Sequence, residues 1–360
     1  MSVARRSCAL GVVAVGAFCS VFAGVAVGAR WTIVPTPRGF FGGQAVAASA
    51  PAVVWAFGFE GVMRWDGASW QPVTAPAAVL QGGVVFSARQ AWAVGSTPVA
   101  GPSGDGHGVV IRWDGQSWRV VLRTTRRGAL TGLSRVPATH RLWAVGFHDK
   151  HGAQFPLIRH RDAAGWHRVA GAPVGRGELA AVASGRHGSW AVGARFTGSG
   201  IAALAERWTG RRWVTTSVPH PAGISLRAVA AVPGTRRAWA VGFLNGADNR
   251  PVSFLWSHGA WHQHPIDLGR RFGELQGVVS IRPGDAWAVG DRWGTSRILR
   301  TAIVHWTSGP AWQAVPTPTP TGGCASNLAG ITKVPGTPGP TLWAVGDHGC
   351  NGQMLSERYP

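Results

Sequence analysis

The sequence predicts an all-β protein, a seven-bladed β-propeller, and three observations support this fold class. A segment close to Trp-Ala-Val-Gly recurs seven times, each repeat divides into the same four short strands, and the N-terminal strand supplies the one that the last repeat lacks. Repeats of about fifty residues with strand and turn signals are typical of propellers, whose four-stranded blades surround an axis.

The N-terminal residues have the pattern of an export signal. Arg5 and Arg6 form a positive region, residues 11–26 are apolar, and Val27-Gly28-Ala29 offers small residues for cleavage. We therefore expect a signal peptide at 1–29 and a propeller domain at 30–360. A retained membrane anchor is the alternative, although the apolar stretch is shorter than the roughly twenty residues of a spanning helix. The two arginines fit either the general secretory route or the twin-arginine route of export.

The recurring segment marks the second strand of each expected blade. It begins at Trp55, Trp92, Trp143, Trp190, Trp239, Trp287 and Trp343. A small apolar strand such as 226–232 precedes it, narrow enough to line the axis. A third strand follows and ends in Arg-Trp, as in Arg64-Trp65. After a tight turn such as Asp66-Gly67, the fourth strand opens with Trp, as at Trp70.

The two ends of the chain are predicted to share one blade. The last repeat stops at Arg358-Tyr359-Pro360, where the third strand ends in the other repeats. Residues 31–37 match residues 312–318 almost letter for letter, so they read as the missing fourth strand. We expect the seventh blade to consist of residues 324–360 plus strand 31–37. This pairing would close the ring and leave no open sheet edge.

The four-strand unit resembles the kelch repeat of galactose-oxidase-like propellers, and it is similar to Trp-rich secreted propeller proteins of GC-rich bacteria that have no assigned activity. The resemblance implies a fold and no chemistry. Kelch units carry a double Gly and a Tyr where this chain has one Gly and a Trp. The turn at 65–70 also looks like a shortened Asp-box of sialidase propellers. Tyr359 is the only tyrosine, so neither the copper ligands nor the tyrosine nucleophile of those enzymes has a counterpart.

The charge balance favours an anionic partner. The chain has 35 Lys and Arg against 15 Asp and Glu, a net charge of +20, and only Lys150 and Lys333 are lysines. We expect an anionic polysaccharide or envelope polymer, or an extracellular protein, as the partner. Nucleic acid is not expected as the partner of an exported protein. The alternative is a coding bias of a GC-rich genome toward Arg. No second apolar run of membrane length follows the signal.

Residues that the repeat does not need are the candidates for ligand binding. Nineteen of the 20 tryptophans are assigned to the blades, and Trp293 is left over, after Asp291-Arg292, in an expected loop where it would stack on a sugar ring. The alternative is a side chain folded against the blade edge. Loops that lead into the axial strands carry further arginines, which would contact an anionic ligand: Arg38, Arg126, Arg127, Arg176, Arg270 and Arg271.

Catalytic and metal-binding signatures are scarce. Glu178 and Glu274 are the only carboxylates expected to face the tunnel, where they would either cleave a glycosidic bond or pair with Arg. We expect no metal and no cofactor, because the densest histidine cluster, 148–151, lacks ligand spacing. Cys324 and Cys350 are the only cysteines beyond the signal and are predicted to form a disulfide. The sequence thus favours a secreted, non-catalytic binding protein or extracellular scaffold over a polysaccharide hydrolase or lyase.

Overall fold

A computed structural model describes residues 29–40, 42–98, 106–268, 272–294, 298–318, 320, 323–350 and 352–360. Every regular element within these ranges is a β-strand. No helix in the described ranges is long and apolar enough to span a membrane. The predicted signal peptide lies outside the described residues except for Ala29, and so do Arg270 and Arg271 of the predicted site.

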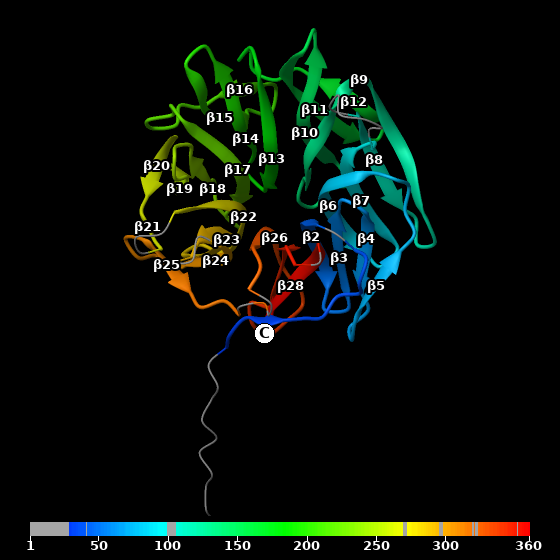
Figure 1. Ribbon diagram of the computed structural model, residues 1–360. Coiled ribbons are helices and arrows are strands. Elements are labelled where there is room, and N and C mark those ends of the chain that lie inside the picture. The colour runs from blue at the N-terminus through cyan, green and yellow to red at the C-terminus, as the bar shows by residue number, and fades with distance from the viewer. Residues whose placement is uncertain are drawn as a thin grey trace, which may run out of the picture.

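The described strands follow one another around a ring (Figure 1). They are β1 (Thr32–Ile33), β2 (Gly43–Ala50), β3 (Val53–Gly58), β4 (Gly61–Trp65), β5 (Trp70–Val73), β6 (Val79–Ser87), β7 (Gln90–Ser96), β8 (His107–Trp113), β9 (Trp118–Arg135), β10 (Leu142–Lys150), β11 (Ala153–Asp162), β12 (Gly165–Val169), β13 (Gly177–Gly185), β14 (Gly188–Thr197), β15 (Gly200–Trp208), β16 (Trp213–Thr215), β17 (Ile224–Ala231), β18 (Ala238–Leu244), β19 (Arg250–Ser257), β20 (Ala260–His264), β21 (Ile266–Asp267), β22 (Gly273–Arg282), β23 (Asp285–Trp293), β24 (Leu299–Trp306), β25 (Trp312–Val315), β26 (Ser326–Lys333), β27 (Leu342–His348) and β28 (Gln353–Tyr359).

Consecutive strands pair in antiparallel order, and only the short β21 pairs in parallel, with β25, among the described strands; this arrangement confirms the all-β propeller. The sheets are β2 to β5, β6 to β12, β13 to β16, β17 to β20, β22 to β25 with β21 added at the edge, and β26 to β28 with β1. The first part of β9 pairs with β8 and its second part pairs with β10. We interpret the seven-stranded sheet as two four-stranded units that share β9, which brings the number of units to seven. The units are numbered below in this order, from the first (β2 to β5) to the seventh (β26 to β28 plus β1).

The ring closes through the two chain ends, as predicted. Thr32 and Ile33 of β1 pair with Arg358 and Glu357 of β28, and the dark-blue segment before β2 runs beside the red β28 in Figure 1. The backbone N–H of Val34 extends the pairing by donating to the carbonyl of Ser356, at 2.8 Å. The predicted disulfide also lies in this seventh unit and joins Cys324 to Cys350, with Cα atoms 5.2 Å apart.

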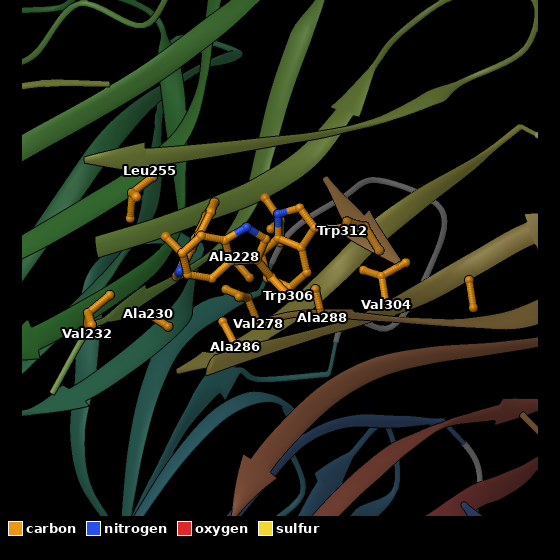
Figure 2. Packing of buried hydrophobic residues seen from close by; sticks show 14 of the residues in the cluster. Ala228, Ala230, Val232, Leu255, Val278, Ala286, Ala288, Val304, Trp306 and Trp312 are labelled. Carbon is orange, nitrogen blue, oxygen red and sulfur yellow. The ribbon is translucent and has the colours of Figure 1, made fainter. Parts of the chain in front are cut away.

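Tryptophans hold neighbouring units together. The second-strand Trp of one unit packs on aromatic residues at the end of the third strand or the start of the fourth strand of the next unit. Between the fifth and sixth units, Trp239 lies 4.8 Å from Trp306 and 4.9 Å from Trp312, measured between ring centroids, within the apolar cluster of Figure 2. The same contact crosses the seam, where Trp343 lies 4.9 Å from Trp65. The repeat tryptophans are therefore the packing surface between units.

The arginine of the Arg-Trp motif has a structural role as well. In the first and seventh units its guanidinium lies over the second-strand Trp of the same unit, at 5.6 Å for Arg64 over Trp55 and 5.7 Å for Arg358 over Trp343. Such cation–π contacts stabilise a protein by roughly 0.5–2 kcal/mol, depending on exposure. Part of the arginine excess thus belongs to the scaffold and carries no information about a ligand.

A β-bulge near the start of the first strand explains the glycine of the recurring segment. The extra residue pushes the backbone of the first strand toward the second strand, directly opposite that glycine. A Cβ atom at Gly290 would lie only 1.9 Å from the carbonyl oxygen of Glu274, and one at Gly95 would meet Val79 in the same way. The bulge occurs in all seven units, at Gln44, Gln81, Thr131, Ala180, Arg227, Gln276 and Ala329.

Candidate ligand-binding site in the central channel

The bulge residues surround a cavity on the axis of the ring. The cavity has a volume of about 520 Å³ and is lined by residues of the first strand of every unit, the seven bulge residues included. The residue that follows each bulge is Gly or Ala, such as Gly82, Gly132, Gly277 and Gly330. A Cβ atom at Gly132 would approach the backbone of Ala181 in the next unit to 2.9 Å. Small residues therefore let neighbouring first strands come close while the bulge residues face the channel.

Five of the seven bulge positions carry polar side chains. Gln44, Gln81 and Gln276 bring amides to the cavity wall, and each amide can both donate and accept hydrogen bonds. The hydroxyl of Thr131 donates to the carbonyl of Leu179 in the next unit at 2.6 Å, so it is engaged within the scaffold. The wall of the channel is thus mainly an amide surface, with one charged bulge residue at Arg227.

Arg227 and Glu178 form the charged part of the wall. Arg227 Nη1 lies 3.6 Å from Glu178 Oε1, and both residues line the cavity. The Arg227 guanidinium also lies 5.2 Å from the centre of the Phe243 ring. Both side chains are partly exposed, so they remain accessible to a ligand in the channel. Glu178 therefore faces the tunnel, as the sequence predicted, and it does so beside a cation.

Glu274 occupies the equivalent position two units away, but it belongs to a hydrogen-bond network. Asn249 Nδ2 donates to its Oε1 at 2.5 Å, and Gln276 Nε2 donates to its Oε2 at 2.6 Å. Asp291 is its cross-strand partner and is buried. Burial, together with the negative charge of Glu274, raises the pKa of Asp291 to about 7. Among the described residues, Glu178 lines the channel cavity and Glu274 does not.

The predicted arginines are distributed over several units. Arg38 and Arg176 are exposed just before the first strands β2 and β13. Arg126 and Arg127 are also exposed, but the expectation that they lie in a loop was wrong, because both are within β9. The fourth strand of the second unit continues into the first strand of the third without a turn, and Arg127 pairs with His107 of β8.

Trp293 is exposed, although its predicted place in a loop was wrong. It is the last residue of β23, where it pairs with Leu299, and its N–H donates to the carbonyl of Phe272 at 2.8 Å. Its side chain is 41% exposed, whereas the tryptophans of the repeat are buried or half-buried. The neighbouring Arg292 is half-buried, and its Nε donates to the carbonyl of Thr301 at 3.4 Å. The strand therefore fixes the backbone and leaves the indole at the surface.

The polar bulge residues that line the channel were not predicted from the sequence, although the sequence contains a pattern that marks them. The first strands read Leu80-Gln81-Gly82, Leu130-Thr131-Gly132 and Leu275-Gln276-Gly277, a polar residue between Leu and Gly. In a regular strand the middle residue of the three would point to the opposite face of the sheet from the Leu and the Gly. At the bulge the polar residue lines the axial cavity while the leucine stays buried.

Comparisons with known proteins support the fold alone. No protein-family model and no curated protein sequence matches this chain. A solved structure of the Myceliophteria thermophila Cps50 (Swd1) β-propeller domain is similar, with a TM-score of 0.59 and 11% identity over 91% of this chain and 98% of that chain. The extracellular domain of a hybrid two component system from B. thetaiotaomicron (BT4673) has a TM-score of 0.58 and 11% identity, over 91% of this chain and 39% of that chain.

Proposed function

We propose that this protein is a secreted, non-catalytic propeller that binds an anionic polysaccharide or another glycan of the cell envelope in its central channel. The ring of bulge residues carries the proposal. Binding sites are concave surfaces in which a few polar groups fix the orientation of the ligand. The amides of Gln44, Gln81 and Gln276 suit sugar hydroxyls, and Arg227 suits a carboxylate or sulfate.

Two further features support an extracellular glycan partner. The Cys324–Cys350 disulfide is of a kind that persists in oxidising compartments outside the cytoplasm, in agreement with the proposed signal peptide. Arg38, Arg126 and Arg176 are exposed where chain segments enter the first strands, so they would attract an anionic chain toward the channel. We further propose that the units are kelch-like, on the basis of their strand order and turn residues.

A glycan array of the protein from Arg30 onward, followed by calorimetry, tests the channel. We expect Gln44→Leu combined with Gln81→Leu to weaken binding of an array hit at least tenfold, because buried sugar hydroxyls would lose their partners. The matched control replaces Arg211, Arg212, Arg236 and Arg237, which lie in turns outside the channel lining, by Gln. Equal losses from both sets would mean diffuse attraction and would overturn the channel site.

Trp293 does not line the channel cavity, and we propose it as a separate contact for the same glycan. If its exposed indole stacks on a sugar ring, Trp293→Ala should weaken binding roughly tenfold, since stacking on bases contributes about 1–3 kcal/mol and 1.4 kcal/mol corresponds to one decade. The melting temperature should hardly change. Trp239→Ala, in the contact between units, should instead lower stability by several kcal/mol through the cavity it leaves. Similar losses of stability in both variants would remove Trp293 from the site.

A polysaccharide hydrolase or lyase is the second candidate, and the Glu178–Arg227 pair in the channel is the observation that favours it. A carboxylate beside a cation can serve as a base or as a nucleophile at a glycosidic bond. Incubating each array hit with the protein and with Glu178→Gln, and following new reducing ends, decides between binding and cleavage. Cleavage that disappears in Glu178→Gln would replace the binding proposal with the enzymatic one.

A further inference from the structure

The turn between the third and fourth strands carries an aspartate in the first three units. Asp66, Asp114 and Asp162 each use Oδ1 to accept backbone N–H groups of their own turn, for example from Ala68 at 2.8 Å and from Ala164 at 2.9 Å. An Asx turn of this kind is a structural device. It leaves Oδ2 free to face the two strands that the turn connects.

The residues that face Oδ2 differ between units. The second unit has the cross-strand pair Arg112 and Arg119, of which Arg119 Nε lies 3.5 Å from Asp114 Oδ2. In the third unit the equivalent cross-strand pair is His160 on β11 and His167 on β12. Their Nδ1 atoms lie 3.8 Å and 3.9 Å from Asp162 Oδ2. The third unit has therefore exchanged an ion pair for two imidazoles around one carboxylate oxygen.

We propose that His160, Asp162 and His167 bind a divalent transition metal ion of the zinc class. One ligand atom from each residue lies within 4.8 Å of the other two. Bonds of about 2.0–2.2 Å place the ligand atoms of a tetrahedral zinc site roughly 3.3–3.5 Å apart, so a small movement completes the site. His167 is exposed and can rotate, whereas His160 is held against Trp143 with ring centroids 4.2 Å apart. Two imidazoles and a carboxylate suit zinc and its neighbours better than calcium or magnesium.

The surroundings leave a coordination position open. The two histidines line a cavity of about 560 Å³, together with Arg141, Arg186 and Arg207. The arginines disfavour a bare cation and favour an anion as its fourth ligand. This site is independent of the proposed glycan channel, because it belongs to the third and fourth strands.

A histidine at either position alone also occurs in other units, where it packs within the scaffold. The combination of both histidines with one aspartate is not needed for that packing. His305 of the sixth unit occupies the position of His160 and stacks on Trp287 with centroids 3.8 Å apart, but it hydrogen-bonds Asp285 from another strand at 2.9 Å. His262 of the fifth unit occupies the position of His167, where its Nε2 lies 3.3 Å from the carbonyl of Ser257. Among the described residues, only the third unit brings both histidines to one carboxylate.

Calorimetric titration of the untagged protein from Arg30 onward with ZnCl₂ tests the site. We expect one equivalent to bind, and Zn²⁺ to raise the melting temperature. His167→Gln and Asp162→Asn should each weaken binding at least tenfold, and Asn can still cap the turn. The matched control, His262→Gln, should bind as the parent does. No binding by the parent, or equal weakening in the control, would overturn the proposal. If Asp162→Asn melts below the parent without metal, His167→Gln on the exposed strand decides.

Discussion

The fourth and seventh units each bury a glutamate at the same position of the third strand, but the hydrogen bonding of the two carboxyl groups differs. Glu206 and Glu357 both lie two residues before the aromatic that ends the third strand, and both are fully buried. Four other units place apolar side chains at this position, at Met63, Ile111, Phe254 and Val304, all equally buried, whereas the third unit places Arg159 there. A carboxyl there must give up its hydration in the contact between units, so its partners determine the cost.

One difference between the two sites is a backbone N–H. Ala172 donates to Glu206 Oε2 at 3.1 Å, whereas neither carboxylate oxygen of Glu357 has a hydrogen-bond partner in the described part of the chain. The residue six positions after the fourth-strand Trp is Ala172 before the fourth unit and Pro318 before the seventh, and proline has no N–H. Burial raises the pKa to about 7 for Glu206 and to about 8 for Glu357.

The seventh unit is also the seam of the ring. The fourth unit is one continuous segment, from Gly177 to Thr215, whereas the seventh combines β26 to β28 with β1 from the other end of the chain. The Cys324–Cys350 disulfide lies in the seventh unit as well. The less satisfied carboxyl therefore lies in the unit that is closed by the chain end and by a covalent bond.

Removing residues 31–37 should affect the stability of the seventh unit more than any other change considered for the two units. The deletion takes β1 and Trp31 from the seventh unit, and it exposes β28 as an open edge with Glu357 behind it. We expect loss of the cooperative thermal transition, or aggregation, in calorimetry. Removing Arg30 alone is the control and should leave the melt unchanged. A deletion variant that melts like the parent would show that the ring does not depend on this strand.

Replacing each buried glutamate by Met, the residue of the first unit, should stabilise the seventh unit more than the fourth. The folded-state pKa of Glu357 is about 8 against an ordinary value of 4.5. Its burial therefore costs stability progressively as pH rises from 4.5 to about 8, up to about 5 kcal/mol as an upper bound. Glu357→Met should remove this loss, and the gain should be largest above pH 8 and smallest near pH 4.

The matched variant is Glu206→Met, whose gain should be smaller and should level off near pH 7. Denaturant unfolding at pH 4.5, 6.5 and 8.5 measures both differences. If Glu206→Met is stabilised as much as Glu357→Met at pH 8.5, the hydrogen bond from Ala172 contributes nothing and the comparison fails.

The contrast between these units also shows what the sequence can and cannot predict. Tryptophans and turn residues recur with a long period, so the strand order, the shared seventh unit and the disulfide follow from local patterns. The bulges do not, because one extra residue such as Gln81 changes the facing of a strand without changing its composition. The cluster of His160, Asp162 and His167 depends on cross-strand register. The predicted loop at Trp293 was wrong because strand β23 continues past the end of the recurring segment, which the repeat does not indicate.

Reducing the Cys324–Cys350 bond should affect only the seventh unit directly. The bond spans 26 residues, and the loop-entropy model gives about 3 kcal/mol for its loss. The double variant Cys324→Ser and Cys350→Ser should show that decrease in denaturant unfolding, and dithiothreitol should add nothing further to it. A parent protein whose stability is indifferent to reduction would contradict the contribution of the bond.

Pro318→Ala is the smallest change and the most direct test of the backbone N–H. From its equivalent position in the sequence, we expect the new N–H of residue 318 to donate to Glu357 as Ala172 donates to Glu206, so the pKa of Glu357 should fall toward that of Glu206. Hydrogen bonds to charged groups contribute about 1.5–3 kcal/mol, and the freer backbone of Ala offsets about 0.4–1 kcal/mol of that gain. We therefore expect a net stabilisation of about 1–2 kcal/mol at pH 8.5 and none at pH 4.5, where the carboxyl is protonated.

The control is Pro318→Ala in the Glu357→Met background, which should lack the gain at pH 8.5 because no carboxylate remains to accept the bond. Equal effects in both backgrounds would mean that proline acts through backbone stiffness alone, and the difference between the two glutamates would then need another cause.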